Sequence, residues 1–230
     1  MASSGLNWPP RTVVNPQQLD GDVADPEPKE ISWSGEILRK LTHLFALVIP
    51  LGYYYLDLTR WQALAILVPI SIFIITVDFS RLGGWPLWRL FRPLIAPMVR
   101  RDELTGNFTG ATYILATACL TIALFARPVA VLALTFIITG DPASAMIGRR
   151  FGRHRLKNKS LEGSLAFLSV ALLVALIIPE VPLVIGLTGA VVATVTEGLS
   201  FRVDDNASVP LLSGLYMTLC WRILEFWQMG

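Results

Sequence analysis

The chain has 230 residues and a formal net charge of +2; 53% of its residues are hydrophobic (AVILMFWYC) and 16% are charged. Soluble domains carry about 25% charged residues. When Gly is counted as apolar in place of Tyr, the apolar share of this chain is about 58%, whereas soluble domains have ~45–50%. A chain of this length has too little interior to hide so much apolar surface from water. A soluble globule, a disordered chain and a fibrous repeat are therefore excluded, and we expect the bilayer to be the solvent.

The first 32 residues differ from the rest in composition. Prolines stand at positions 9, 10, 16, 26 and 28, and acidic residues at 20, 22, 25, 27 and 30. Because proline breaks helices and like charges repel, we predict a disordered cytoplasmic tail at 1–32 and a transmembrane domain at 33–230. The tail resembles neither a secretory signal, which needs a basic and then an apolar segment, nor a transit peptide, which is poor in acids.

Apolar runs of about 16–23 residues recur after Lys40, and they predict an all-α, polytopic bundle of about seven transmembrane helices. The predicted spans are 41–58, 61–80, 107–126, 128–148, 163–179, 181–201 and 207–226. The segment 85–101 mixes Trp, Arg and three prolines, which is typical of a segment lying at the membrane interface.

The distribution of positive charge sets the expected orientation. With seven spans and the N-terminus inside, 16 of the 19 Lys and Arg residues lie on the cytoplasmic side, as the positive-inside rule requires. We therefore expect an integral protein of a prokaryotic plasma membrane with its N-terminus and active site in the cytoplasm. No internal repeat is visible, and an odd number of spans gives no support to an inverted-repeat transporter.

A carboxylate interrupts one predicted span. Asp141 lies in the stretch ITGDPASAMIGRR, about eight residues before a basic loop and still at membrane depth by helical rise. Charged residues at that depth are costly and usually functional. Between Gly140 and Pro142 we expect the helix to break, with Asp141 capping a short new helix. The alternative is a capped kink with no catalytic role.

The loop at 148–163 carries six cations between Arg149 and Lys159. Such a field suits a polyphosphate, although cytoplasmic loops of membrane proteins are basic in any case. The segment Lys159-Ser160-Leu161-Glu162-Gly163 favours the polyphosphate site, because it opens the next helix, where anions bind well. It is not a P-loop, since the chain contains no GxxxxGK[ST] sequence.

Acidic residues collect on the same predicted membrane side, among them Asp78, Glu197, Asp204 and Asp205. Carboxylates mixed with Arg and Lys suit a magnesium–nucleotide site, in which oxygens hold the metal and cations hold the phosphates. Most of these acids, taken one at a time, could simply be exposed to water at the edge of the membrane. That alternative explains Glu197 and Asp141 poorly, because both interrupt apolar helices. Small residues at 109–112 are interpreted as a helix-packing face.

Five motifs occur together and in order: RKLTH at 39–43, TGATY at 109–113, GDPASAMIGRRFG at 140–152, KSLEGS at 159–164, and Glu197 followed by Asp205-Asn206 and Pro210. With them the chain resembles the dolichol kinase, phytol kinase and CTP-dependent diacylglycerol kinase family of membrane lipid kinases. The resemblance implies transfer of the γ-phosphoryl group of CTP to the hydroxyl of a lipid alcohol, with Mg²⁺ or another divalent cation. It extends from about Glu36 to the C-terminus.

The candidate site combines the motifs with this resemblance. The candidate catalytic residues are Asp141, Glu197 and Asp205, of which Asp141 and Glu197 would also hold the metal. The candidate nucleotide- and phosphate-binding residues are Arg39, Lys40, Gly148, Arg149, Lys159, Glu162 and Asn206. The expected partners are a lipid alcohol, a nucleoside triphosphate and the bilayer, with no nucleic acid.

Two other functions stay open. Phosphatidate cytidylyltransferases share a similar arrangement, but their glycine-rich C-terminal signature ending in D-R-x-D is missing here, where the sequence reads DDNASVPLLSG. A transporter is less consistent with polar residues that crowd one membrane face. The sequence does not distinguish diacylglycerol, polyprenol, phytol or farnesol as acceptor, nor CTP from ATP without the resemblance, and it leaves the general base, the oligomeric state and the role of the tail open.

Overall fold

The computed structural model describes residues 40–96, 99, 106–156, 159–178, 180–199 and 204–229. All of these residues belong to one contact unit, Ile31–Gly230. The predicted tail at 1–32 and the candidate residue Arg39 lie outside the described residues.

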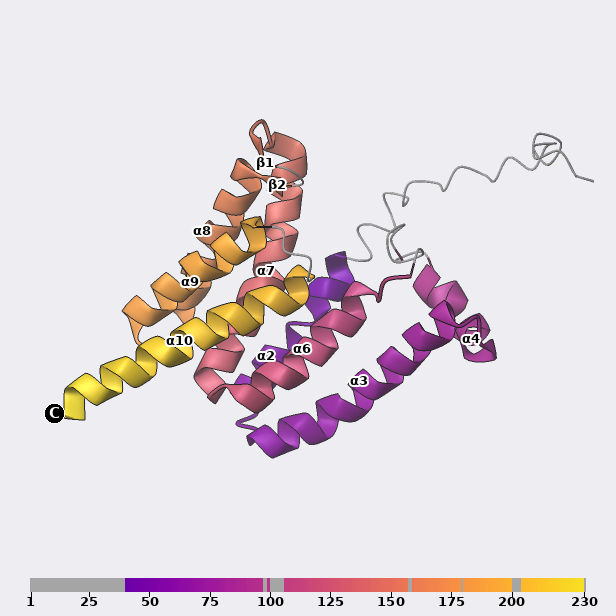
Figure 1. The fold of residues 1–230 in the computed structure, drawn as a ribbon, viewed down its shortest axis with the longest axis horizontal. Helices are drawn as coiled ribbons and strands as arrows, with labels where there is room; N and C mark the ends of the chain where they lie inside the picture. Colours follow the sequence, from indigo (N-terminus) through magenta and orange to yellow (C-terminus); the bar gives the residue numbers. More distant parts are fainter. Residues whose placement is uncertain are drawn as a thin grey trace, which may run out of the picture. The chain divides into compact units, whose positions relative to one another are not determined.

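The described chain is helical apart from one short hairpin (Figure 1). The helices are α2 (Val48–Tyr55), α3 (Arg60–Leu82), α4 (Pro86–Ile95), α6 (Gly110–Leu124), α7 (Arg127–Phe151), α8 (Leu161–Ile177), α9 (Leu183–Gly198) and α10 (Asp205–Met229). Among the described residues α3, α7 and α10 are long and apolar enough to cross a membrane, and α6, α8 and α9 are shorter apolar helices. The predicted all-α membrane bundle is confirmed, and each predicted span contains a helix.

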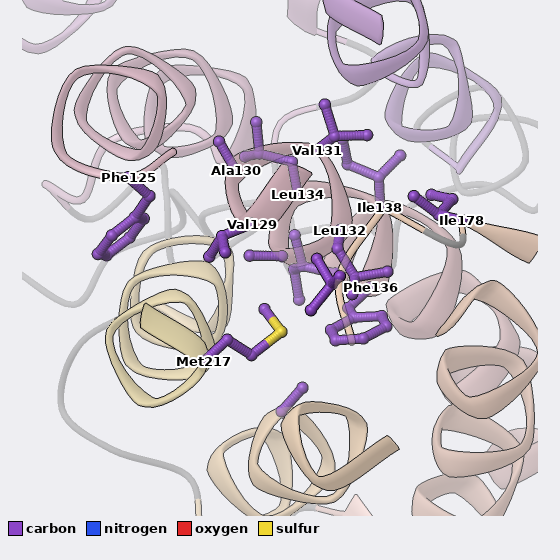
Figure 2. Close-up of a cluster of buried hydrophobic side chains, with 14 of the residues drawn as sticks. Phe125, Val129, Ala130, Val131, Leu132, Leu134, Phe136, Ile138, Ile178 and Met217 are labelled. Atoms are coloured by element: carbon purple, nitrogen blue, oxygen red, sulfur yellow. The ribbon is translucent and has the colours of Figure 1, made fainter. Parts of the chain in front are cut away.

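Helix α7 forms the core of this bundle. Every residue from Val129 to Ile138 is buried, so the helix is covered on all sides, and it contacts α2, α6, α8, α9 and α10. Figure 2 shows Met217 of α10 pointing toward the same cluster as Leu132 and Phe136 of α7. A helix that is apolar all round is expected to lie inside a bundle.

The predicted break at Asp141 is wrong. Helix α7 runs without interruption from Arg127 to Phe151, and Pro142 lies in its interior. Proline removes one backbone hydrogen bond and strains the preceding turn, but neighbouring helices stabilise such a position inside a membrane bundle. Pro142 is itself buried, so packing against those neighbours keeps the helix continuous through the motif.

The first predicted span, 41–58, is not one helix. A helical segment covers residues 40–45, turns occur at Ala46 and Leu47, and α2 begins at Val48. Pro50 accounts for the interruption, because it has no N–H to donate to the carbonyl of Ala46, four residues before it. The predicted interfacial segment 85–101 contains α4, which is held against the end of α3: Trp88 N donates to Ser80 Oγ at 2.7 Å.

Candidate active site

Lys159 is positioned by a tight hairpin between α7 and α8. Strands β1 (Arg155–Leu156) and β2 (Lys159–Ser160) pair antiparallel, with Leu156 opposite Lys159. Ser160 then caps α8, its Oγ accepting a hydrogen bond from Gly163 N at 3.1 Å. The cap fixes where the helix begins, and it thereby fixes the backbone from which Lys159 projects.

Three candidate residues from distant parts of the chain meet at one ion-pair cluster. The Nζ atom of Lys159 donates to Glu197 Oε1 at 2.6 Å and to Asp205 Oδ2 at 2.7 Å. Glu197 lies near the end of α9 and is fully buried, while Asp205 is the first residue of α10. We call this group, together with the two serines described next, the Lys159 cluster.

Two serines complete the coordination of Glu197. Ser144 Oγ of α7 donates to Glu197 Oε1 at 3.0 Å, and Ser164 Oγ of α8 donates to Glu197 Oε2 at 3.4 Å. A buried carboxylate is tolerated only when it is paired and hydrogen-bonded, and here both oxygens are satisfied. Neither serine was predicted as a site residue, although Ser144 lies in the GDPASAMIGRRFG motif and Ser164 in the KSLEGS motif.

The carboxylates keep Lys159 charged. Burial by itself lowers the pKa of the ammonium, but the charges of Asp205 and Glu197 and their hydrogen bonds outweigh burial and raise the pKa above its ordinary value of 10.5. The cluster therefore holds one permanent cation between two carboxylates. The side chains of Lys159 and Asp205 remain 22% and 24% exposed, whereas that of Glu197 is 0% exposed.

Asp141 differs from this cluster because its carboxylate is left available. It is half-buried on α7, about one turn before Ser144, and it makes no hydrogen bond or ion pair with any other described residue. One turn before it on the same helix, the carbonyl of Ile137 lies 3.5 Å from His43 Nε2. Asp141 thus lies between the His43 contact and the Lys159 cluster along α7.

Glycines bring α7 and α8 into close contact. A Cβ at Gly148 would lie 2.7 Å from Ser160 Oγ, and one at Gly163 would lie 2.9 Å from Ser144 O. Either contact is closer than real Cβ atoms approach another atom. A side chain at Gly163 would push the backbones of the two helices apart, and one at Gly148 would displace the capping hydroxyl of Ser160. In the structure the neighbour of Gly148, a candidate phosphate-binding residue, is the Ser160 cap of α8.

The carboxylate of Glu162 pairs with His154, which precedes strand β1 of the hairpin. Its Oε1 lies 2.9 Å from His154 Nδ1 and accepts a hydrogen bond from His154 N at 3.3 Å. Arg149 is exposed in the last turn of α7, and Lys40 is half-buried in the first described helical segment. The pairing of Glu162 with His154 was not predicted, because it depends on the hairpin that brings them together.

A second buried carboxylate anchors the TGATY motif. Asp78 of α3 accepts hydrogen bonds from Arg81 Nε at 2.7 Å, Thr109 N at 2.7 Å and Thr112 Oγ1 at 2.9 Å. Only 4% of its surface is exposed. The small-residue face predicted at 109–112 is therefore also the attachment point of α6 to the end of α3.

Asn206 lies beside the Lys159 cluster. Its N and Nδ2 both donate to Asp204 Oδ1, at 2.9 and 2.7 Å. Its Oδ1 is buried and accepts no hydrogen bond from the described part of the chain. The start of α10 thus presents an ion-paired carboxylate at Asp205 and an unsatisfied acceptor at Asn206.

Comparison with known proteins finds distant relatives. CTP-dependent diacylglycerol kinase 1 of Saccharomyces cerevisiae is 27% identical over 211 residues, covering 79% of this chain and 72% of the yeast protein. The protein of the same name from Eremothecium gossypii is 24% identical over 210 residues, or 79% and 66%. This chain is a distant relative of the CTP-dependent diacylglycerol kinases. The family resemblance inferred from the motifs is confirmed at that distance.

Other comparisons add less. An uncharacterized protein of Rickettsia prowazekii is 25% identical over 190 residues, covering 79% of this chain and 92% of that protein. No protein-family model matches the chain. No solved structure matches it.

Proposed function

We propose that this protein is a CTP-dependent lipid kinase. The lipid hydroxyl oxygen attacks the γ-phosphorus of CTP, the bond between that phosphorus and the β–γ bridging oxygen breaks, and CDP and a lipid monophosphate leave with release of the hydroxyl proton. The observation that carries the proposal is the Lys159 cluster, which gathers residues of three motifs at one place. The names of the relatives from Saccharomyces cerevisiae and Eremothecium gossypii support the donor and the type of acceptor.

Lys159 would neutralise phosphate charge during the transfer. Phosphoryl transfer depends mainly on positioning and on stabilising charge that spreads over the phosphate oxygens. An ammonium held between two carboxylates is already in place before the nucleotide arrives. Arg149, Lys40 and Arg39 are the further cations that we assign to the phosphates.

Asp205 is the better candidate for the general base. Glu197 is fully enclosed, whereas the side chain of Asp205 is 24% exposed. A general base must reach the proton that it removes, so only Asp205 of this pair can be approached by an alcohol. Glu197 then has a positioning role, because it holds Lys159.

The residues present fit a phosphate-bound Mg²⁺. No group of three His, Cys, Asp or Glu side chains suited to a metal occurs among the described residues. Mg²⁺ at nucleotide sites, however, commonly takes only one or two carboxylates besides phosphate oxygens and water. We assign the ion to Asp141, whose carboxylate is available, whereas Glu197 is committed to Lys159. Held there, the ion would supply positive charge that stabilises the phosphates.

The membrane orientation remains part of this proposal. We place the nucleotide site at the cytoplasmic leaflet of a prokaryotic plasma membrane, because the cations surrounding the site belong to the predicted inner loops. Lipid alcohol would then reach the site from the bilayer and CTP from the cytoplasm.

A substrate panel tests the function. The full chain in detergent micelles is incubated with diacylglycerol, a polyprenol, phytol or farnesol, each with CTP or with ATP. We expect CDP and one lipid monophosphate, with Asp205→Asn inactive but folded as judged by thermal unfolding. Formation of pyrophosphate and a CDP-lipid would instead show a cytidylyltransferase, and no nucleotide turnover with any alcohol would contradict the kinase.

A further inference from the structure

A large cavity lies outside the Lys159 cluster. Its volume is about 620 Å³, and its walls come mainly from α2, α3 and α6 and from the helical segment at 40–45, with further residues from α4, Val99 and the start of α10. None of Lys159, Glu197 and Asp205 lines it. The volume falls within the roughly 300–1,000 Å³ of small-molecule sites in proteins.

The body of this cavity is apolar and long. On α3 its lining runs from Ala63 through Leu67 and Ile74 to Asp78. Fifteen residues of helix between Ala63 and Asp78 correspond to roughly 22 Å at the helical rise. That length exceeds half of the ~30 Å hydrocarbon core of a bilayer. It therefore suits an extended hydrocarbon chain.

The cavity is open toward the outside of the bundle. Three of its lining residues, Phe45, Val48 and Ile66, remain 75%, 58% and 54% exposed. All three are apolar, so in a membrane this opening faces acyl chains. A lipid could enter from the bilayer without crossing water.

The polar lining lies toward the beginning of α10. Apart from Tyr53 and Trp88, the polar and charged lining residues are Thr42, His43, Asp78, Thr109, Asp204 and Asn206. Asp78 already accepts three hydrogen bonds, whereas Asn206 Oδ1 is buried without a donor from the described residues. An unpaired buried acceptor is costly, and a hydroxyl group is a donor that would satisfy it.

We propose that this cavity binds the hydrocarbon chain of the lipid alcohol. The hydroxyl donates its hydrogen to Asn206 Oδ1 while the lipid is bound alone, and it turns that hydrogen to the neighbouring Asp205 when the phosphate is transferred. The inference rests on the proposed kinase function. It follows from the order of residues at the start of α10: Asp204 and Asn206 line the cavity, and Asp205 between them binds Lys159. The acceptor hydroxyl and the phosphate-binding cation are thereby brought to adjacent residues.

Gly52 offers a way to fill the cavity. It lines the cavity on α2, and a Cβ placed there meets no atom within 4 Å. Gly52→Phe should therefore place a ring in space that the lipid needs, from a Cβ that is clear of every neighbour. Leu51→Phe is the matched control, because Leu51 is the preceding residue, is exposed and does not line the cavity.

Photo-crosslinking tests the site directly. The full chain in micelles is labelled with diacylglycerol bearing a diazirine in one acyl chain and, separately, with a diazirine-bearing farnesol, and the adducts are mapped by peptide mass spectrometry. We expect adducts on α2 and α3 that excess unlabelled alcohol competes away. Gly52→Phe should reduce them at least five-fold, whereas Leu51→Phe should label like the unmodified chain.

Two results would contradict the proposed binding site. The first is adducts confined to other helices. The second is equal labelling of α2 and α3 by diazirine-bearing phosphatidylcholine, which would show that the cavity takes up lipids in general. Competition in the unmodified chain gives an answer even if Gly52→Phe fails to fold. Labelling needs no CTP, so specific adducts without kinase activity would contradict the proposed function alone. Kinase activity with adducts elsewhere would contradict this inference alone.

Discussion

Lys159 and Glu197 are 38 residues apart in the chain, yet their side chains meet at 2.6 Å, with the carboxylate fully enclosed by the bundle. The same ammonium also binds Asp205. These two contacts therefore connect the hairpin between α7 and α8 to the end of α9 and to the start of α10. Loss of either partner should affect both stability and catalysis, and the two effects can be separated.

Lys159→Met should destabilise the protein by about 3–5 kcal/mol, because it leaves the Glu197 charge buried without its partner. The double variant Lys159→Met/Glu197→Gln should recover most of that loss, since an amide can still bond Ser144 and Ser164. Thermal unfolding in micelles measures the stability, and CTP turnover should stay absent in both variants. Full activity in the double variant would contradict the phosphate role of Lys159.

Asp141→Asn should lower turnover by roughly 100-fold or more, the scale found when one charge-stabilising group is removed from an active site. Its unfolding temperature should not fall, because Asp141 makes no hydrogen bond to another described residue. Steady-state CTP turnover at several Mg²⁺ concentrations provides the measurement. Near-normal turnover in a folded Asp141→Asn protein would rule out our assignment of the metal.

Asp78→Asn should destabilise by about 3–5 kcal/mol, because it removes a buried negative charge that pairs with Arg81 and accepts hydrogen bonds from Thr109 and Thr112. The matched control is Asp57→Asn, which removes an ion pair with Arg127. The side chain of Asp57 is 83% exposed. Exposed pairs contribute only about 0–1 kcal/mol. Equal effects of the two substitutions on the unfolding temperature would show that Asp78 does not anchor α6.

Gly148→Ala should cost about 1–3 kcal/mol through overpacking, because its Cβ would lie 2.7 Å from Ser160 Oγ. Gly52→Ala is the control within a helix: it has open space, and it should be neutral or stabilise by about 0.5–1 kcal/mol. Thermal unfolding of both variants distinguishes close packing from general intolerance of alanine. A stable Gly148→Ala protein would mean that α7 and α8 can separate without loss.

The helices could be predicted from the sequence because apolar runs and membrane thickness restrict their length and position. The grouping of Lys159, Glu197 and Asp205 could also be anticipated, because the three residues belong to motifs of one family. Their mutual ion pairing could not, since it depends on how α8, α9 and α10 pack.

Other features depended on tertiary contacts that no local pattern reports. Pro142 predicts a break by its own chemistry, but burial by neighbouring helices keeps α7 continuous. From the sequence, Thr109 and Thr112 are interpreted only as small packing residues. Their hydrogen bonds to Asp78 depend on the packing of α3 beside α6. The cavity next to Asn206 is likewise a product of packing, with lining residues spread over several helices.

The most direct test of the kinase proposal follows the label of CTP into the lipid. The full chain is given diacylglycerol or a polyprenol with CTP labelled at either the γ- or the α-phosphate, and the lipid products are separated. The proposal predicts that only γ-label enters the lipid, and that Asp141→Asn and Asp205→Asn abolish this transfer. Entry of α-label with release of pyrophosphate would contradict it.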